Sequence, residues 1–131
     1  MSKCTVMIVD DDKFLLDMYK KKFELYGAEV EVGVGSEDGL NKLRGGLKPD
    51  ILILDIIMPG MDGLELLETV RKEKLTPDST VVMLTNESGH DKIEKAKSLG
   101  IKGYVVKATS VPSEVVEEVL KIAGVKFDKS A

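Results

Sequence analysis

Four short apolar runs in this 131-residue chain end in polar residues that could do chemistry together. These residues are Asp10-Asp11-Asp12 after Thr5–Val9, Asp55 after Ile51–Leu54, Thr85-Asn86 after Thr80–Leu84, and Lys107 after Gly103–Val106. Carboxylates that gather raise one another's pKa unless a cation joins them. A donor set made of oxygen atoms favours Mg²⁺, which keeps several waters and shares phosphate oxygens.

The same residues suit transfer of a phosphoryl group to an aspartate. A carboxylate can act as a nucleophile and form an acyl phosphate. Such transfer mainly needs positioning and neutralisation of charge, which Mg²⁺, a lysine and a threonine hydroxyl can supply. Taken singly, each residue has an ordinary interpretation: a turn, a helix cap, a strand-end hydroxyl or a surface cation. Their shared position at strand ends favours the chemical interpretation.

The elements that must hold these residues follow from hydrophobic periodicity. The four apolar runs and Val30–Val34 are predicted strands, and helical patterns fill the gaps between them. Five helices are expected, each with one apolar face. In chain order these faces contain Leu15, Tyr19, Phe23 and Tyr26; Leu40, Leu43 and Leu47; Leu64, Leu67 and Val70; Ile93, Ala96 and Leu99; and Val116, Val119, Leu120 and Ala123. Strict alternation with short connections predicts a parallel α/β sheet with helices on both faces. Ligands of such sheets bind outside the carboxyl ends of the strands.

Local signals refine this arrangement. The alternating stretch from Glu29 to Val34 predicts an edge strand with one wetter face. Ser36 and Ser88 are candidate helix N-caps, and Pro112 suits the first turn of the last helix. Pro59-Gly60 predicts a rigid bend with a positive φ after Asp55.

Composition excludes several classes of protein. The formal net charge of −4 argues against non-specific nucleic-acid binding. The apolar runs are too short to span a membrane, and the start of the chain does not resemble a signal peptide. Cys4, the single cysteine, cannot form an internal disulfide or a thiol metal site, and is expected to be a small buried hydrophobe. We expect a cytoplasmic location and one domain over 1–125, followed by a short tail over 126–131 without an output domain.

The motifs resemble the receiver domain of two-component response regulators, from Thr5 to about Ala123. The stretches that carry the resemblance are Val9-Asp10-Asp11-Asp12, the run Asp55-Ile56-Ile57-Met58-Pro59-Gly60-Met61-Asp62-Gly63, Thr85 and Lys107. The resemblance implies a doubly wound, flavodoxin-like (βα)5 fold with strand order 2-1-3-4-5.

It also implies roles for individual residues. Asp55 would be the phosphoacceptor, and Asp11 and Asp55 would coordinate Mg²⁺ directly. Asp10 would assist, and the backbone carbonyl of Ile57 would be the third protein ligand. The phosphoryl-binding residues would be Thr85 and Lys107, and the switch residues Thr85 and Tyr104.

Two positions stand apart from the family pattern. Asp12 falls one position past the metal pair, so it is interpreted as a cap or surface residue. The family often has Lys-Pro with a cis bond where this chain has Lys107-Ala108. Because a cis bond before alanine costs about 2.5–4 kcal/mol, cis and trans forms both stay open here.

The family implies a sensor histidine kinase or phosphotransfer protein as phosphodonor. It implies a downstream protein partner on the face of the fourth helix, fifth strand and fifth helix, roughly Ser88 to Ala123. We expect no direct nucleic-acid or membrane binding, and either a monomer or a phosphorylation-dependent dimer.

Two other functions compete with the signalling switch. One is an aspartyl-phosphate phosphohydrolase, a class that typically needs a second acid two residues after the nucleophile, where this chain has Ile57. The other is a receiver-like interaction domain that is not phosphorylated. The full set of acids with Thr85 and Lys107 argues against that hypothesis.

Overall fold

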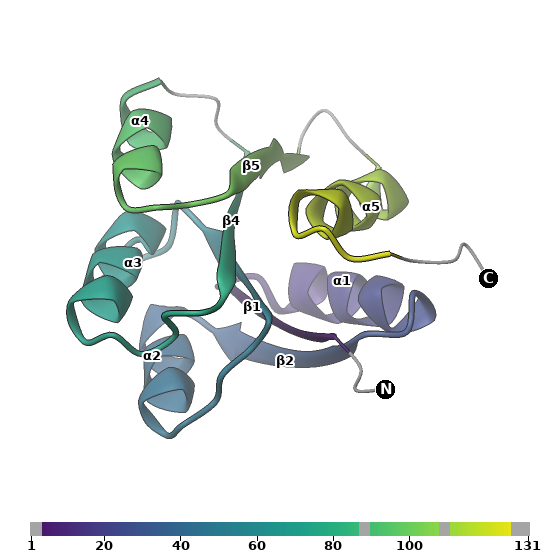
Figure 1. Ribbon diagram of the computed structural model, residues 1–131, viewed down its shortest axis with the longest axis horizontal. Helices are drawn as coiled ribbons and strands as arrows, with labels where there is room; N and C mark the ends of the chain where they lie inside the picture. Colours follow the sequence, from purple (N-terminus) through teal and green to yellow (C-terminus); the bar gives the residue numbers. More distant parts are fainter. Residues whose placement is uncertain (1–3, 87–89, 108–110, 127–131) are drawn as a thin grey trace.

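The chain folds into alternating strands and helices, as the computed structural model shows for residues 4–86, 90–107 and 111–126 (Figure 1). The elements are β1 (Thr5–Asp10), α1 (Lys13–Leu25), β2 (Glu29–Val34), α2 (Ser36–Arg44), β3 (Ile51–Asp55), α3 (Gly63–Lys72), β4 (Thr80–Thr85), α4 (His90–Ser98), β5 (Gly103–Val106) and α5 (Pro112–Ile122). Within these described ranges, no helix is long and apolar enough to cross a membrane.

The strands form one parallel sheet in the order β2-β1-β3-β4-β5, which confirms the predicted topology. β2 lies at the edge and alternates between more exposed and more buried residues, as its polar-apolar pattern predicts. β1 and β3 lie inside the sheet and are buried almost throughout. Strands that are covered on both faces read as continuous apolar runs for this reason.

Helices cover both faces of the sheet (Figure 1). On one face, α1 and α5 pack on alternate strand residues such as Ile8 and Ile53. On the other, α2, α3 and α4 pack on the residues between them, such as Met7 and Leu52. Because successive side chains of a strand point to opposite faces, each strand contributes to two separate cores.

Three strands extend one residue further than their apolar runs. Asp10, Asp55 and Thr85 are the last residues of β1, β3 and β4, and each is still in register with a neighbouring strand. The polar groups of the predicted site are therefore held by the ladder of sheet hydrogen bonds and not by free loops. Backbone pairing in the sheet is indifferent to side-chain polarity, so hydrophobicity alone places these boundaries too early.

Several local predictions have clear outcomes. Asp12 is the N-cap of α1, where its Oδ1 accepts hydrogen bonds from two backbone N–H groups. Pro112 begins α5, as predicted. The predicted cap at Ser36 is wrong: Gly35 is the N-cap of α2, and no side chain caps this helix. Ser88 and Ala108 lie outside the described residues, so the cap predicted at Ser88 and the geometry of the Lys107-Ala108 bond stay untested.

The buried face of α1 contains Tyr19 and Phe23, as predicted, but differs at its first position. Leu16 is buried with Tyr19 and Phe23, whereas Leu15 is only partly buried. Cys4 is likewise partly buried, against the core under α1 and α5. Leu15 is thereby left near the carboxyl edge of the sheet.

Candidate functional site

The first acidic segment lies where β1 ends between β2 and β3. Asp10 is buried with 3% of its surface exposed, and its Oδ1 accepts a 3.0 Å hydrogen bond from the Asp12 backbone N–H. Asp11, between them, is exposed. The three consecutive acids therefore have three different environments: a buried carboxylate, an exposed one and a helix cap.

The second segment is the end of β3 and the loop that follows it. Asp55 is buried, with 8% exposed. In the loop, Ile56 and Met58 are buried whereas Ile57 is 45% exposed. The loop turns at Gly60, whose φ of 76° matches the predicted bend, and closes through a 2.8 Å hydrogen bond from the Gly63 N–H to the Ile56 carbonyl. Buried side chains on both sides of Ile57 thus fix the backbone beside Asp55.

The structure brings Asp10, Asp11 and Asp55 together. One carboxylate oxygen from each lies within 4.8 Å of the others. All the donors are hard oxygen atoms, and such an acidic group is typical of the Mg²⁺ site of receiver domains. The negative charge of three carboxylates exceeds the single positive charge that Lys107 brings. The residues present therefore fit a divalent cation.

Lys107 reaches the acids from the end of β5, on the far side of the sheet from β2. Its Nζ lies 2.7 Å from Asp10 Oδ2 and 3.5 Å from Asp55 Oδ2. All three side chains are largely buried. A buried ion pair of this kind persists only when further hydrogen bonds satisfy its members. Lys107 is therefore a fixed part of the site and not a surface cation.

Burial and charge shift the acid–base properties of this group. Burial raises the pKa of Asp55 to about 6. The Lys107 ammonium opposes this rise, whereas the negative charge of Asp10 adds to it. A hydrogen bond from the Ile57 backbone to the Asp55 carboxylate also opposes the rise. Burial acts to lower the pKa of Lys107, but its hydrogen bond to Asp10 and the nearby carboxylates raise it overall. The site thus contains an ionised lysine that faces Asp55, a carboxyl that burial makes reluctant to ionise.

A small open pocket of about 180 Å³ lies over these residues. Its lining consists of Asp10, Asp11, Asp12, Leu15, Asp55, Ile57, Asn86 and Lys107. Sequence analysis named Asn86 at a strand end without giving it a role, and did not assign Leu15 to the site. Leu15 lies one helical turn after Asp12, a spacing that could have indicated its position. The apolar Leu15 and Ile57 lie beside the acids in this lining.

The two predicted switch residues lie in different surroundings. Thr85 is the buried last residue of β4, with 0% exposed, and pairs with Val106 of β5. Tyr104, on β5, is 40% exposed. The pocket lining on the β4 side is Asn86 and not Thr85. The structure therefore gathers the acids and Lys107 in one pocket, whereas Thr85 and Tyr104 lie outside its lining.

Comparisons with known proteins agree with this geometry. The family model described as "Response regulator receiver domain" matches residues 6–119. PhoB, the phosphate regulon transcriptional regulatory protein of Pseudomonas aeruginosa, is 30% identical over 112 residues, which are 86% of this chain and 48% of PhoB. The response regulator VraR of Staphylococcus saprophyticus is 35% identical over 92 residues, 70% of this chain and 42% of VraR. This chain spans about half the length of these curated relatives.

Solved structures show the same fold. The chemotaxis protein CheY4 of Vibrio cholerae superposes with a TM-score of 0.83 at 26% identity, covering 92% of this chain and 99% of CheY4. A CheY-like receiver domain protein from Methanospirillum hungatei superposes with a TM-score of 0.83 at 28% identity, covering 94% and 95% of the two chains. Because the family model matches most of the sequence and these folds extend over nearly all of it, the chain belongs to the response regulator receiver domain family.

Proposed function

We propose that this chain is a phosphorylation-controlled signalling switch in which Asp55 accepts a phosphoryl group. The observation that carries the proposal is the group formed by Asp10, Asp11 and Asp55, with carboxylate oxygens within 4.8 Å of one another and Lys107 Nζ in contact with two of them. Receiver domains are signalling modules and not conventional enzymes.

Each residue has a defined part in this proposal. Asp11, Asp55 and the Ile57 carbonyl would hold Mg²⁺, with Asp10 assisting. When bound, Mg²⁺ supplies positive charge that offsets the charge of the phosphoryl oxygens. Asp55 has an open approach, because the pocket over it is lined by Ile57 and Leu15 and opens to solvent.

The transfer itself exchanges one bond for another. A carboxylate oxygen of Asp55 attacks phosphorus and forms an acyl phosphate, while the bond from phosphorus to the donor breaks and its electron pair leaves with the donor. Family membership implies a histidine kinase or phosphotransfer protein as this donor. Phe14, 90% exposed in the first turn of α1 and next to the pocket residue Leu15, offers an apolar contact for it.

Lys107 is proposed to change its ion-pair partner when Asp55 is phosphorylated. It now contacts Asp10 and Asp55, and it would pair with the new phosphoryl oxygens, which carry more negative charge than one carboxylate.

Ile57 supports the switch over a phosphohydrolase, because its side chain cannot act as the general acid that such enzymes use. The phosphorylated state is then expected to be long-lived enough to signal.

The covalent step has a direct test. Incubation with Mg²⁺ and acetyl phosphate should add one phosphoryl group, seen by intact-mass spectrometry, and Asp55→Asn should abolish the addition. Asp50→Asn is the matched control, because Asp50 lies at the opposite edge of the sheet just before β3. Equal labelling of the wild type and Asp55→Asn would remove Asp55 from the role of phosphoacceptor.

The output is proposed to pass through Thr85 and Tyr104. Thr85 would move toward the phosphoryl oxygens and the exposed Tyr104 side chain would turn inward, which changes the face of α4, β5 and α5. That face would bind a downstream protein or form a phosphorylation-dependent dimer. Hydrogen exchange with and without beryllofluoride should change on these elements. Changes confined to α1 and α2 would overturn this output face.

A further inference from the structure

The junction between β2 and α2 contacts both halves of the acidic site without contributing a charged group to it. Gly35 donates its backbone N–H to the Asp10 carbonyl at 2.9 Å. The next residue, Ser36, donates its hydroxyl to the Met61 carbonyl at 2.7 Å. Asp10 ends β1, and Met61 belongs to the loop that follows Asp55. Two consecutive residues therefore connect the two segments that bear the acids.

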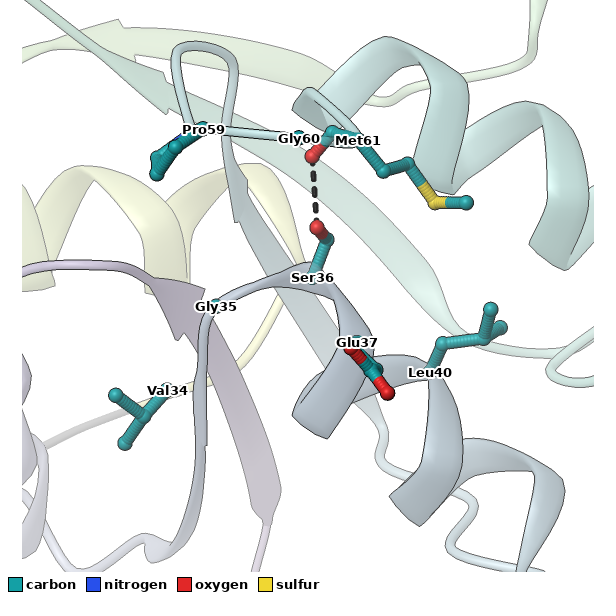
Figure 2. Close-up of a pocket in the computed structure, with 8 residues that line it drawn as sticks. All are labelled: Val34, Gly35, Ser36, Glu37, Leu40, Pro59, Gly60 and Met61. Atoms are coloured by element: carbon teal, nitrogen blue, oxygen red, sulfur yellow. Dashed lines mark hydrogen bonds between the residues drawn. The ribbon is translucent and has the colours of Figure 1, made fainter.

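Ser36 joins this loop to α2, whereas the other side-chain hydrogen bonds of the loop that the structure describes involve Asp55 at the end of β3 and the Asp62–Glu65 cap at the start of α3. Buried Ile56 and Met58 hold the part of the loop beside Asp55, whereas the Pro59-Gly60 bend that precedes Met61 is exposed. Figure 2 shows the Ser36 hydroxyl directed from the start of α2 to the Met61 carbonyl, just after Pro59 and Gly60. Loss of this bond would remove the hydrogen bond between α2 and the loop next to the exposed bend.

The position of Ser36 is fixed by close packing of α2 on the sheet. A Cβ atom on Gly39 would lie 2.9 Å from Val9 Cγ2, and a Cβ atom on Gly33 would lie 2.8 Å from the Gly39 Cα. The absence of side chains at these glycines lets the first turn of α2 lie directly on β1 and β2. Asp38 adds a 2.9 Å hydrogen bond from the Val34 N–H. Ser36 is consequently held by backbone contacts and is itself 5% exposed.

We infer that Ser36 is a positioning residue for the metal site, which holds the loop after β3 so that the Ile57 carbonyl and Asp55 stay in place beside Asp10 and Asp11. This inference rests on the proposed function. Groups that orient metal ligands through hydrogen bonds affect affinity although they do not touch the metal. The loop also touches Asp55 itself, through the hydrogen bond from the Ile57 backbone.

The surroundings of Ser36 allow its effect on the metal site to be measured with little change in the stability of the fold. Ser36 and Met61 line a hollow of about 420 Å³ together with Val34, Leu40 and Pro59. Because this hollow is open to solvent, water can reach the Met61 carbonyl when the hydroxyl is removed. Ser36→Ala should therefore lose little stability, while the loop becomes more mobile.

The chain offers a matched control at the other edge of the sheet. Ser79 also donates its hydroxyl to a backbone carbonyl, that of Pro49, before the start of β4. Ser79→Ala removes the same kind of bond far from the acids. Ser36→Thr keeps a hydroxyl at the first residue of α2, where the side chain lines the hollow.

The experiment is an NMR titration of the unphosphorylated protein with Mg²⁺, together with hydrogen exchange of the loop amides at 57, 58 and 60–63 without metal. Ser36→Ala should raise the Kd for Mg²⁺ about tenfold and speed exchange in the loop. Ser79→Ala should match the wild type in both, and Ser36→Thr should restore both. The urea midpoints of Ser36→Ala and Ser79→Ala should shift alike.

The outcomes distinguish this inference from the function on which it rests. Wild-type Mg²⁺ affinity in Ser36→Ala, or an equal loss in Ser79→Ala, would overturn the positioning role alone. A wild-type protein that binds no Mg²⁺ at residues 10–12 and 55–58 would overturn the proposed function and this inference with it. Loss of affinity in Ser36→Ala, regained in Ser36→Thr, would support both.

Discussion

The two edges of the sheet use similar residues in opposite ways. At the amino edge, Asp50 is exposed and accepts a 2.9 Å hydrogen bond from the Thr5 N–H, which joins the start of β1 to the segment before β3. At the carboxyl edge, Asp10 and Asp55 are buried beside Lys107. The first acid stabilises the fold through the backbone. The others are held close together with more negative charge than Lys107 can balance.

The difference follows from the direction of the chain. In a parallel sheet with crossover helices, helices begin near the carboxyl edge and end near the amino edge. α1, α2 and α3 start just after β1, β2 and the loop that follows β3. Their first N–H groups carry partial positive charge, which favours anions at that edge. An acid at the amino edge faces helix ends of the opposite sign and is better placed in solvent.

Removal of Lys107 should have the largest effect on this contrast. Lys107→Met leaves Asp10 and Asp55 buried without a cation, so the metal-free protein should lose about 3 kcal/mol of unfolding free energy at pH 7.5. The loss should shrink at pH 5, because Asp55, whose pKa burial already raises, can then take up a proton. Urea denaturation would measure both values. Lys102→Met, at an exposed lysine before β5, should change neither.

Asp55→Asn should have the next largest effect, and it should be stabilising. The folded-state pKa of Asp55 is raised to about 6, above its unfolded value, so the folded protein binds this proton more tightly than the unfolded chain does. Stability from Asp55 is therefore full below the unfolded pKa and is lost as the pH rises through about 6. The metal-free variant should be roughly 1–3 kcal/mol more stable than wild type at pH 7.5 and equal to it near pH 4. If Asp55→Asn instead destabilised the protein at neutral pH, the ionised Asp55 carboxylate would not be costly to bury.

Variants of Asp11 and Asp12 test whether two neighbouring acids at the carboxyl edge have separate roles, one in metal binding and one in helix capping. Asp11→Asn should weaken Mg²⁺ binding about tenfold with no change in stability, because Asp11 is exposed and belongs to the acidic group. Asp12→Ala should lose about 1 kcal/mol of unfolding free energy through its cap and keep Mg²⁺ affinity. NMR titration and urea denaturation of both variants would show whether the two effects separate.

Asp50→Ala should have the smallest effect and complete the comparison. It removes an exposed hydrogen bond to the Thr5 N–H, so the loss should be about 0.5 kcal/mol of unfolding free energy. Mg²⁺ binding and phosphorylation should stay at wild-type levels. A marked loss of either would show that the two edges are coupled through the sheet.

The sequence by itself determined the fold class and the acids of the candidate site. Five apolar runs alternate with helical periodicity, and this local pattern suffices for a parallel sheet with β2 at its edge. Asp10, Asp11, Asp55 and Lys107 follow from their positions after those runs, because parallel strands bring their carboxyl ends to one edge. The cap at Asp12 was also within reach, since capping depends on the next three residues alone.

Only the tertiary structure decided how these residues meet. Lys107 lies nearer to Asp10 than to Asp55, Thr85 is fully buried, and Leu15 lines the pocket although its spacing suggested the core. The Ser36 hydroxyl reaches the Met61 carbonyl and not the helix that it was expected to cap. The contacts among the acids, Lys107, Ser36 and Met61 join segments 25 to 97 residues apart. They depend on strand register and on how closely α2 packs on the sheet, which no local pattern of residues encodes.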